Sequence, residues 1–383
     1  MAGGNNYSFA AAVAIALGVG LYCIHETFLK KDKKKQRVLD LPVIDFKAYE
    51  NRVKDPEGYK LECQKVAHAL HNYGVCIVKD SRVDEKDNTT FLNMMERYFE
   101  GSDGERDARP EHSYQVGVTP AFVERPRNHC TRMGAMGPDN KPLSVCPPEK
   151  DPKWRFFWRI GPRPSKTEFP DLNAAPVIPP EIPEWTNVMD HWGGKMLGAM
   201  ELLSEMAAVG FGLPSDAFTK ILKNGPHLLA PTGSDFNNYG AKDTVLAGYH
   251  YDLNFLTVHG KSRYPGLNIW TRNNERVGVK VPDGCLFVQA GKQIEYLTGG
   301  HVLAGFHEVI VTQATVDTIN QKKANGESLW RVSSTFFGHA QSDQILTPLG
   351  HFKTAESEAK FPAKKVGDQV KDELFAINLD QTS

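Results

Sequence analysis

The sequence has no excess of charge of either sign. Its 383 residues carry 45 Lys and Arg against 46 Asp and Glu, which gives a net charge of −1 at pH 7. Nucleic-acid-binding domains present a basic stripe or a zinc-finger spacing of cysteine and histidine, and neither occurs in this chain. These absences argue against a nucleic-acid partner.

Cysteine is also scarce, and it is scattered through a long chain. Small disulfide-stapled domains concentrate their cysteines in a short frame, which this chain does not do. The sequence therefore predicts free thiols in a reducing compartment. The six residues concerned are Cys23, Cys63, Cys76, Cys130, Cys146 and Cys285.

The apolar run at residues 9–24 contains no charge, and no Lys or Arg precedes it. It therefore lacks the charged first region of a cleaved secretory signal. Sixteen helical residues rise about 24 Å, slightly less than the roughly 30 Å hydrocarbon core of a bilayer. A basic cluster follows at residues 30–35, and such clusters stay on the cytosolic side. The pattern predicts a single membrane-anchoring helix with the catalytic part facing the cytosol, the endoplasmic reticulum being favoured. An organelle-targeting segment and a cleaved signal peptide are the alternatives.

The sequence does contain a group of polar residues that are suited to a metal site. His250 and Asp252 are two residues apart on a segment with strand character, and residues at that spacing point to the same face of a strand. His307 lies far enough along the chain to come from another strand. Two imidazoles and one carboxylate on one face of an octahedral ion leave three positions open, which is the arrangement of non-haem Fe(II) sites.

Arg331 and Ser333 repeat the two-residue spacing within residues 329–337, which the sequence predicts to be one buried strand. An arginine presents a planar fork of donors that matches a carboxylate, and a neighbouring hydroxyl adds a hydrogen bond. The pair is suited to a dicarboxylate co-substrate.

The segments around these residues resemble a known family, the isopenicillin N synthase-like 2-oxoglutarate/Fe(II)-dependent dioxygenases. The resemblance covers roughly residues 40–350 and is most specific in the last hundred. Its motifs are Leu41-Pro-Val-Ile-Asp45, Tyr73-Gly-Val-Cys-Ile-Val78, Gly248-Tyr-His-Tyr-Asp252, Gly266-Leu-Asn-Ile-Trp270, Val281-Pro-Asp-Gly284, Leu297-Thr-Gly-Gly300, His307-Glu-Val309 and Arg331-Val-Ser333.

The resemblance implies a mainly β fold with flanking helices, built on a double-stranded β-helix (jelly-roll) core. It implies Fe(II), 2-oxoglutarate as co-substrate, and O2. It favours His307 over His301 as the third ligand, because the family's ligand directly precedes a Val-rich strand. Tyr239, in Asn237-Asn-Tyr239, resembles a family tyrosine that binds the co-substrate carboxylate; the alternative is a buried tyrosine that closes a turn.

Four segments are predicted on this basis. They are a membrane anchor with its basic flank (1–36), an α/β region with Pro-rich loops and a long helix (37–215), the Fe(II)/2-oxoglutarate core (216–355) and a C-terminal tail (356–383).

Three features depart from the family pattern without removing a ligand. Glu308 follows the third ligand where the family usually has Arg, and Lys292 lies in a turn that often carries Asp. The third is an insertion at residues 312–328, whose polar stretch 317–327 predicts a surface loop. That loop could also cover a substrate.

Local patterns predict the main elements. A helix is expected over residues 55–71, ending at Gly74, and a long one over 185–209 that Gly193-Gly194 weakens. Short strands are expected at 228–230, 253–258, 267–270, 277–281 and 285–289, with Asn273-Asn274 at a hairpin tip.

The sequence thus predicts an oxygenase that hydroxylates or desaturates a small organic molecule and releases succinate and CO2. A membrane anchor would favour a hydrophobic substrate. An Fe(II) oxidase of the same fold that does not use 2-oxoglutarate, and a catalytically silent membrane-tethered binding protein, are the alternatives. Residues expected to face the substrate are Asn254, Gln289 and Phe306, whereas His68, His71, His259, His339 and His351 are expected to be ordinary helix, loop or strand histidines.

Overall fold

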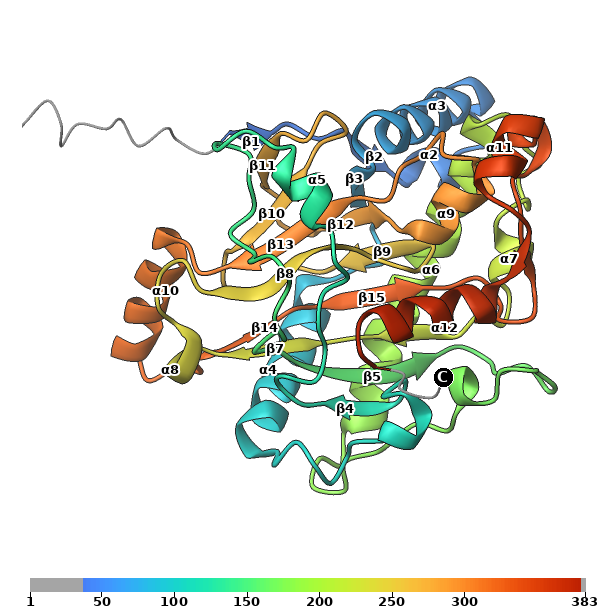
Figure 1. The fold of residues 1–383 in the computed structure, drawn as a ribbon. Coiled ribbons are helices and arrows are strands. Elements are labelled where there is room, and N and C mark those ends of the chain that lie inside the picture. The colour runs from blue at the N-terminus through green and yellow to red at the C-terminus, as the bar shows by residue number, and fades with distance from the viewer. Residues whose placement is uncertain (1–36, 380–383) are drawn as a thin grey trace, which may run out of the picture. The chain divides into compact units, whose positions relative to one another are not determined.

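A computed structural model describes residues 37–379 of the chain. Its centre is formed by two mixed sheets with helices packed around them (Figure 1). The five-stranded sheet has the order β1 (Val38–Leu39), β11 (Arg276–Val279), β10 (Leu267–Trp270), β13 (Phe306–Ile310) and β8 (Val245–Tyr251). The larger sheet has the order β14 (Trp330–Val332), β7 (Thr232–Asp235), β5 (Trp154–Ile160), β6 (His227–Leu229), β15 (Thr335–Gly338), β9 (Leu256–His259), β12 (Cys285–Ala290), β3 (Val75–Lys79) and β2 (Val43–Asp45), with β4 (Gly117–Thr119) beside β5. A third, two-stranded sheet pairs β16 (Ile345–Leu346) with β17 (Lys364–Lys365).

The helices surround these sheets. They are α2 (Lys47–Glu50), α3 (Pro56–Tyr73), α4 (Glu85–Gly101), α5 (Cys130–Gly134), α6 (Trp185–Gly210), α7 (Thr219–Leu222), α8 (Phe236–Tyr239), α9 (Lys292–Leu297), α10 (Gln313–Ala324), α11 (Ala355–Lys360) and α12 (Val366–Ala376). The strands β3 and β5, from the predicted α/β region, pair with strands of the predicted core. The larger sheet is therefore shared by both segments.

The predicted helix over 55–71 forms as α3, and its two ends show why. The Asp55 side chain accepts a hydrogen bond from the Gly58 amide at 2.9 Å, and Pro56 occupies the first turn. Gly74 ends the helix in the left-handed conformation with φ 67°, which glycine adopts without a Cβ penalty. These caps are local, so the sequence alone could place them.

The long helix α6 forms the centre of the hydrophobic core, with Trp185, Trp192 and Met196 fully or almost fully buried. Gly193, which was expected only to weaken the helix, has a packing role. A Cβ at this position would lie 2.3 Å from Cδ1 of Ile160 on β5. Glycine therefore lets the helix approach the sheet closely.

The expected single strand at 329–337 is wrong, because two strands form there. Arg331 in β14 pairs with Ser234 of β7, whereas Thr335–Gly338 (β15) pairs with β6 and β9. At the break, Ser334 accepts a hydrogen bond from the indole of Trp192 at 2.8 Å. This tertiary contact interrupts a run that is continuous in its apolar pattern.

The surface loop expected at 317–327 is also wrong over most of its length, because residues 313–324 form α10. Thr312 and Thr315 form a reciprocal capping box at its start. Thr315 and Ile319, four residues apart, are its buried residues. Ile319 packs against Phe236, Leu246 and Tyr264. A stripe only two residues wide in a polar segment is too weak a periodic signal to predict a helix.

The expectation that all cysteines are free is corrected by a disulfide between Cys130 and Cys146. The loop around α5 folds back so that their Cα atoms lie 5.6 Å apart, a separation that a disulfide spans. Chain spacing could not reveal this proximity. Cys63, Cys76 and Cys285 are buried free thiols, and Cys23 lies outside the described residues.

The predicted membrane anchoring and localisation need correction as well. In the stretch from residue 37 to residue 379, no helix has both the length and the apolar character that crossing a membrane requires. The run at 9–24, on which the prediction depended, lies outside the described residues. Its sixteen residues, rising about 24 Å, were short for a bilayer core of about 30 Å.

Candidate metal centre

Two neighbouring strands bring three predicted ligands together. His250 lies near the end of β8, and His307 lies directly opposite it in the antiparallel register with β13. Asp252 follows β8 immediately. Oδ1 of Asp252 lies 3.7 Å from Nε2 of His250 and 3.9 Å from Nε2 of His307. One donor atom from each residue falls within 4.8 Å of the others, close enough to share one ion.

The protonation of His250 suits a ligand. Its Nδ1 donates to the Gly248 carbonyl at 2.6 Å, so the lone pair of Nε2 faces Asp252. Burial, together with repulsion from His307 and Lys153, holds the pKa of His250 well below its usual value. The imidazole is therefore neutral, which metal coordination requires.

The other two ligands are held by side chains that the sequence did not single out as supports. The Thr257 hydroxyl donates to Oδ2 of Asp252 at 2.6 Å, which leaves Oδ1 facing the histidines. The Gln289 amide lies 2.8 Å from Nδ1 of His307 and donates to the Gly305 carbonyl. Such partners orient metal ligands and tune their basicity.

The three residues expected to face the substrate have different surroundings. Gln289 is fully buried and supports His307. Asn254 lines the cavity beside the ligands, with its amide bonded to the Leu256 carbonyl. Phe306 faces the opposite side of the sheet, where it stacks on Tyr249 and lies under the Arg132 guanidinium. Strand alternation explains this last result, because Phe306 and His307 are adjacent and point to opposite faces.

Glu308, the residue that departs from the family pattern, is fully buried. It accepts hydrogen bonds from the amides of Leu143 and Ser144 at 3.1 and 3.3 Å and from the Ser144 hydroxyl. Burial raises its pKa. Glu308 therefore holds the loop that follows α5 against the sheet.

Arg331 is 6 % exposed, and no acidic residue between positions 37 and 379 pairs with it. Within the described part of the chain, its Nε has no hydrogen-bond acceptor. Burial lowers the pKa of the guanidinium to about 10, with no carboxylate opposing the shift. Buried cations are normally paired, so this position is suited to a bound anion.

Ser333 lies just after the same strand. Its Oγ accepts from the Thr232 amide and from the Thr335 hydroxyl, each at 3.0 Å. Both acceptor positions of this hydroxyl are therefore filled, and its own proton remains available to donate. Ser333 can add a hydrogen bond to an anion held by Arg331.

Tyr239 is not joined to this pair. It ends α8, its ring packs edge-on against Phe122, and no hydrogen bond between residues 37 and 379 connects it to Arg331 or Ser333. The proposed role of Tyr239 stays a prediction.

His259 was missed by sequence reasoning. Its Nδ1 lies 3.2 Å from the Thr335 hydroxyl, and its buried Nε2 has no partner among the described residues. Burial and repulsion from His307 and Arg331 lower its pKa to about 4, although Asp252 acts in the opposite direction. The signal was present: Thr257 and His259 are two apart and place polar groups on one face of β9.

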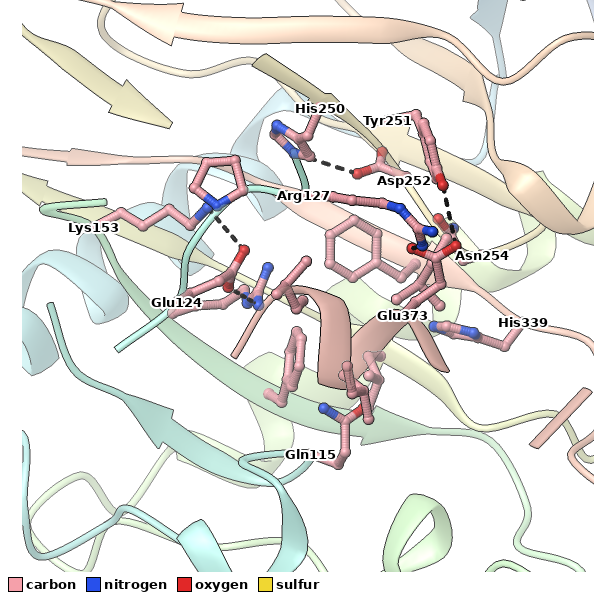
Figure 2. Close-up of a pocket in the computed structure, with 18 residues that line it drawn as sticks. Gln115, Glu124, Arg127, Lys153, His250, Tyr251, Asp252, Asn254, His339 and Glu373 are labelled. Atoms are coloured by element: carbon pink, nitrogen blue, oxygen red, sulfur yellow. Dashed lines mark hydrogen bonds and ion pairs between the residues drawn. The ribbon is translucent and has the colours of Figure 1, made fainter. Parts of the chain in front are cut away.

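A cavity opens beside His250 and Asp252. Figure 2 shows its polar lining, which includes Glu124, Arg127, Lys153, His339 and Glu373. The helix α12 closes one side, because Glu373 and Leu374 line the cavity together with Phe157 of β5 and Phe337 of β15. No residue of the insertion 312–328 lines it. The element in position to cover a bound substrate is therefore α12.

Comparison with known proteins identifies the fold. Residues 41–181 match the family described as the non-haem dioxygenase in morphine synthesis N-terminal region. The chain has the fold of the 2-oxoglutarate/Fe(II) oxygenases. A putative 2OG-Fe(II) oxygenase family protein from Caulobacter crescentus is 19% identical, with a TM-score of 0.68 over 90% of this chain and 100% of that one.

Two further solved structures resemble this chain. One is a full-length Neurospora crassa protein in complex with alpha-KG and thymine, at 17% identity and TM-score 0.66 over 89% of this chain and 99% of that one. The other is JOX2 in complex with 2OG, Fe and JA, at 15% identity and TM-score 0.61 over 91% and 88%. No curated protein matches the chain. These findings confirm the predicted jelly-roll core, and the family match agrees with the predicted resemblance.

Proposed function

We propose that this chain is a 2-oxoglutarate- and Fe(II)-dependent dioxygenase that hydroxylates or desaturates a small organic molecule and releases succinate and CO2. One observation carries the proposal: a three-residue ligand set lies in the same fold as a buried arginine that has no acidic partner among the residues the structure describes. His250, Asp252 and His307 would hold the iron, and Arg331 with Ser333 would hold the far carboxylate of 2-oxoglutarate. The cofactors are those that the JOX2 complex contains.

The donor set supports this assignment. Two imidazoles and a carboxylate are the ligands of the facial triad of non-haem Fe(II) oxygenases. When bound, iron and 2-oxoglutarate supply the power to activate O2 and oxidise a C–H bond, and the protein supplies binding and orientation. The residues of this chain hold the ligands in place, pair the co-substrate charge and exclude water from the buried site.

A direct test uses the protein under argon. Addition of Fe(II) and 2-oxoglutarate should produce a weak visible charge-transfer band, and admission of air should convert 2-oxoglutarate slowly to succinate. An oxidase that does not use 2-oxoglutarate would show neither the band nor succinate. A silent binding protein could bind the metal but would not turn over.

Replacing Thr257 with valine should weaken metal binding without unfolding the protein. The change removes the hydroxyl that orients Asp252 and keeps the side-chain shape. Loss of such an outer partner typically costs roughly 10- to 100-fold in metal affinity or activity. The measurement is Fe(II) affinity by competition with a chelator. Thr318→Val, on α10 away from the site, is the matched control, and equal affinities in the two variants would contradict the assigned role of Thr257.

Replacing His259 with leucine should weaken 2-oxoglutarate binding about tenfold. Nδ1 of His259 donates to the Thr335 hydroxyl, which in turn donates to Ser333, so the ring orients the hydroxyl that leaves the Ser333 proton free to bond the co-substrate. A hydrogen bond to a charged group contributes roughly 1.5–3 kcal/mol. Titration of the charge-transfer band with 2-oxoglutarate measures the change. The exposed His351→Leu should behave like the wild type, and an unchanged titration for His259→Leu would assign this histidine to packing alone.

A further inference from the structure

The charged groups of the substrate-side cavity are already paired with one another. Arg127 binds Glu373 at 2.9 Å, and Glu373 also accepts from the Tyr251 hydroxyl at 3.1 Å. Both pairings appear as dashed lines in Figure 2. This end of the cavity, at α12, therefore has no cation left for a ligand.

The other two cations of the cavity are paired in the same way. Lys153 binds Glu124 at 2.9 Å and Asp151 at 2.7 Å, and Arg155 binds the second oxygen of Glu124. Burial alone would raise the pKa of Glu124, but Arg155 and Lys153 hold it below its usual value. Glu124 is therefore ionised and neutralises its neighbours. Among the described lining residues, each Arg and Lys has a carboxylate partner.

Arg331 differs from these paired cations. It is as deeply buried as Arg155 and Lys153, yet no carboxylate in the described part of the chain pairs with it. Arg331 is therefore a buried cation that is open to an anion, at the position proposed for the co-substrate. A second carboxylate placed in the paired cavity would be buried without a counter-charge, which costs free energy unless an existing ion pair breaks.

The remaining lining of the cavity suits an uncharged molecule. Phe157, Leu228 and Phe337 supply apolar surface. His339 is buried, its Nδ1 has no partner within residues 37–379, and its ring points toward the cavity in Figure 2. Burial, with repulsion from His227 and Arg159, lowers the pKa of His339 to about 3, so the ring is neutral. It can form one hydrogen bond with a polar group of a ligand.

We infer that the substrate is a small neutral molecule with an apolar or aromatic body and at least one hydrogen-bonding group, and that carboxylic acids are excluded. This inference rests on the proposed function, because it assigns the cavity beside the iron ligands to the substrate. The charged pairs orient one another and close the cavity, and the apolar side chains and His339 contact the substrate.

The test compares acids with amides of nearly the same shape. Wild-type protein loaded with Fe(II) and 2-oxoglutarate under argon is titrated calorimetrically with benzoate and benzamide, nicotinate and nicotinamide, and indole-3-acetate and indole-3-acetamide. We expect at least one amide to bind, and each amide that binds to do so about tenfold or more tightly than its acid, because only the acid brings an unpaired charge into the cavity.

A variant should remove most of this preference. Glu373→Gln should leave Arg127 without its carboxylate while keeping an acceptor for the Tyr251 hydroxyl. Affinity for the acids should then rise about tenfold, because the freed cation can pair with a ligand carboxylate, and affinity for the amides should not change. Glu358→Gln, which removes an exposed carboxylate paired with Lys353, is the matched control and should leave both affinities unchanged.

The outcomes separate the two proposals. Acids that bind as tightly as their amides, in samples that show the charge-transfer band, would overturn the neutral-substrate inference and leave the proposed function standing. Failure of all three amides to bind in such samples would also overturn it. Absence of the band, with no binding of 2-oxoglutarate, would overturn the proposed function itself. The wild-type titrations decide the inference even if neither variant folds.

Discussion

Replacement of His307 by alanine is expected to abolish succinate formation and most Fe(II) binding. The side chain supplies one of three donors that fall within 4.8 Å of one another, and no other such group of three His, Cys, Asp or Glu donors occurs in residues 37–379. Loss of a residue that only orients a ligand already lowers metal affinity or activity roughly 10- to 100-fold. Loss of a ligand itself should have a larger effect. Metal content after desalting and uncoupled turnover of 2-oxoglutarate measure the effect.

His301→Ala is the control, because His301 was the competing candidate. In the structure its ring stacks on His71 with 4.0 Å between ring centroids, and it packs against Phe211 and Phe352. We expect this variant to retain iron and turnover. If instead His301→Ala loses both and His307→Ala retains them, the ligand assignment is wrong.

Arg331→Met should weaken the binding of 2-oxoglutarate without lowering the stability of the unliganded protein. Loss of a buried charged partner typically costs 2–5 kcal/mol of binding free energy, and a rise of about 100-fold in the dissociation constant for 2-oxoglutarate corresponds to about 2.8 kcal/mol. Without 2-oxoglutarate the variant should melt no lower than the wild type. Within residues 37–379 the buried guanidinium has no acidic partner to lose, and an apolar isostere of similar volume is well tolerated in such positions. Band titration and thermal unfolding measure the two quantities.

Arg159 offers a control of the same residue type. It is also buried, but its guanidinium donates to the Asn173 side chain at 2.9 Å and to the Gly225 carbonyl at 3.0 Å. Arg159→Met should therefore lower the melting temperature and leave 2-oxoglutarate affinity unchanged. Unaltered 2-oxoglutarate binding in Arg331→Met would remove Arg331 from the co-substrate site and favour the oxidase alternative.

The parts of the protein that could be predicted from the sequence depend on local geometry. The shared strand face of His250 and Asp252 follows from a two-residue period, and α3 follows from Asp55, Pro56 and Gly74 at its ends. The polar insertion was harder, because α10 buries only Thr315 and Ile319. Its helix is stabilised by packing on a distant cluster, which a local pattern does not contain.

Contacts between distant segments were decided by the tertiary structure. The register of β8 with β13 places His307 opposite His250, and the fold of the loop around α5 brings Cys130 to Cys146. The contact of His259 with Thr335 likewise depends on the pairing of β9 with β15.

What the sequence determined by itself is therefore the type and order of the chemical groups, because strand and helix periods act over a few residues. Whether a buried cation is paired, as Lys153 is, or open, as Arg331 is, was decided only by the fold. The physical reason is that electrostatic pairing depends on distance in space, and residues far apart in the chain become neighbours only when the sheets and helices pack together.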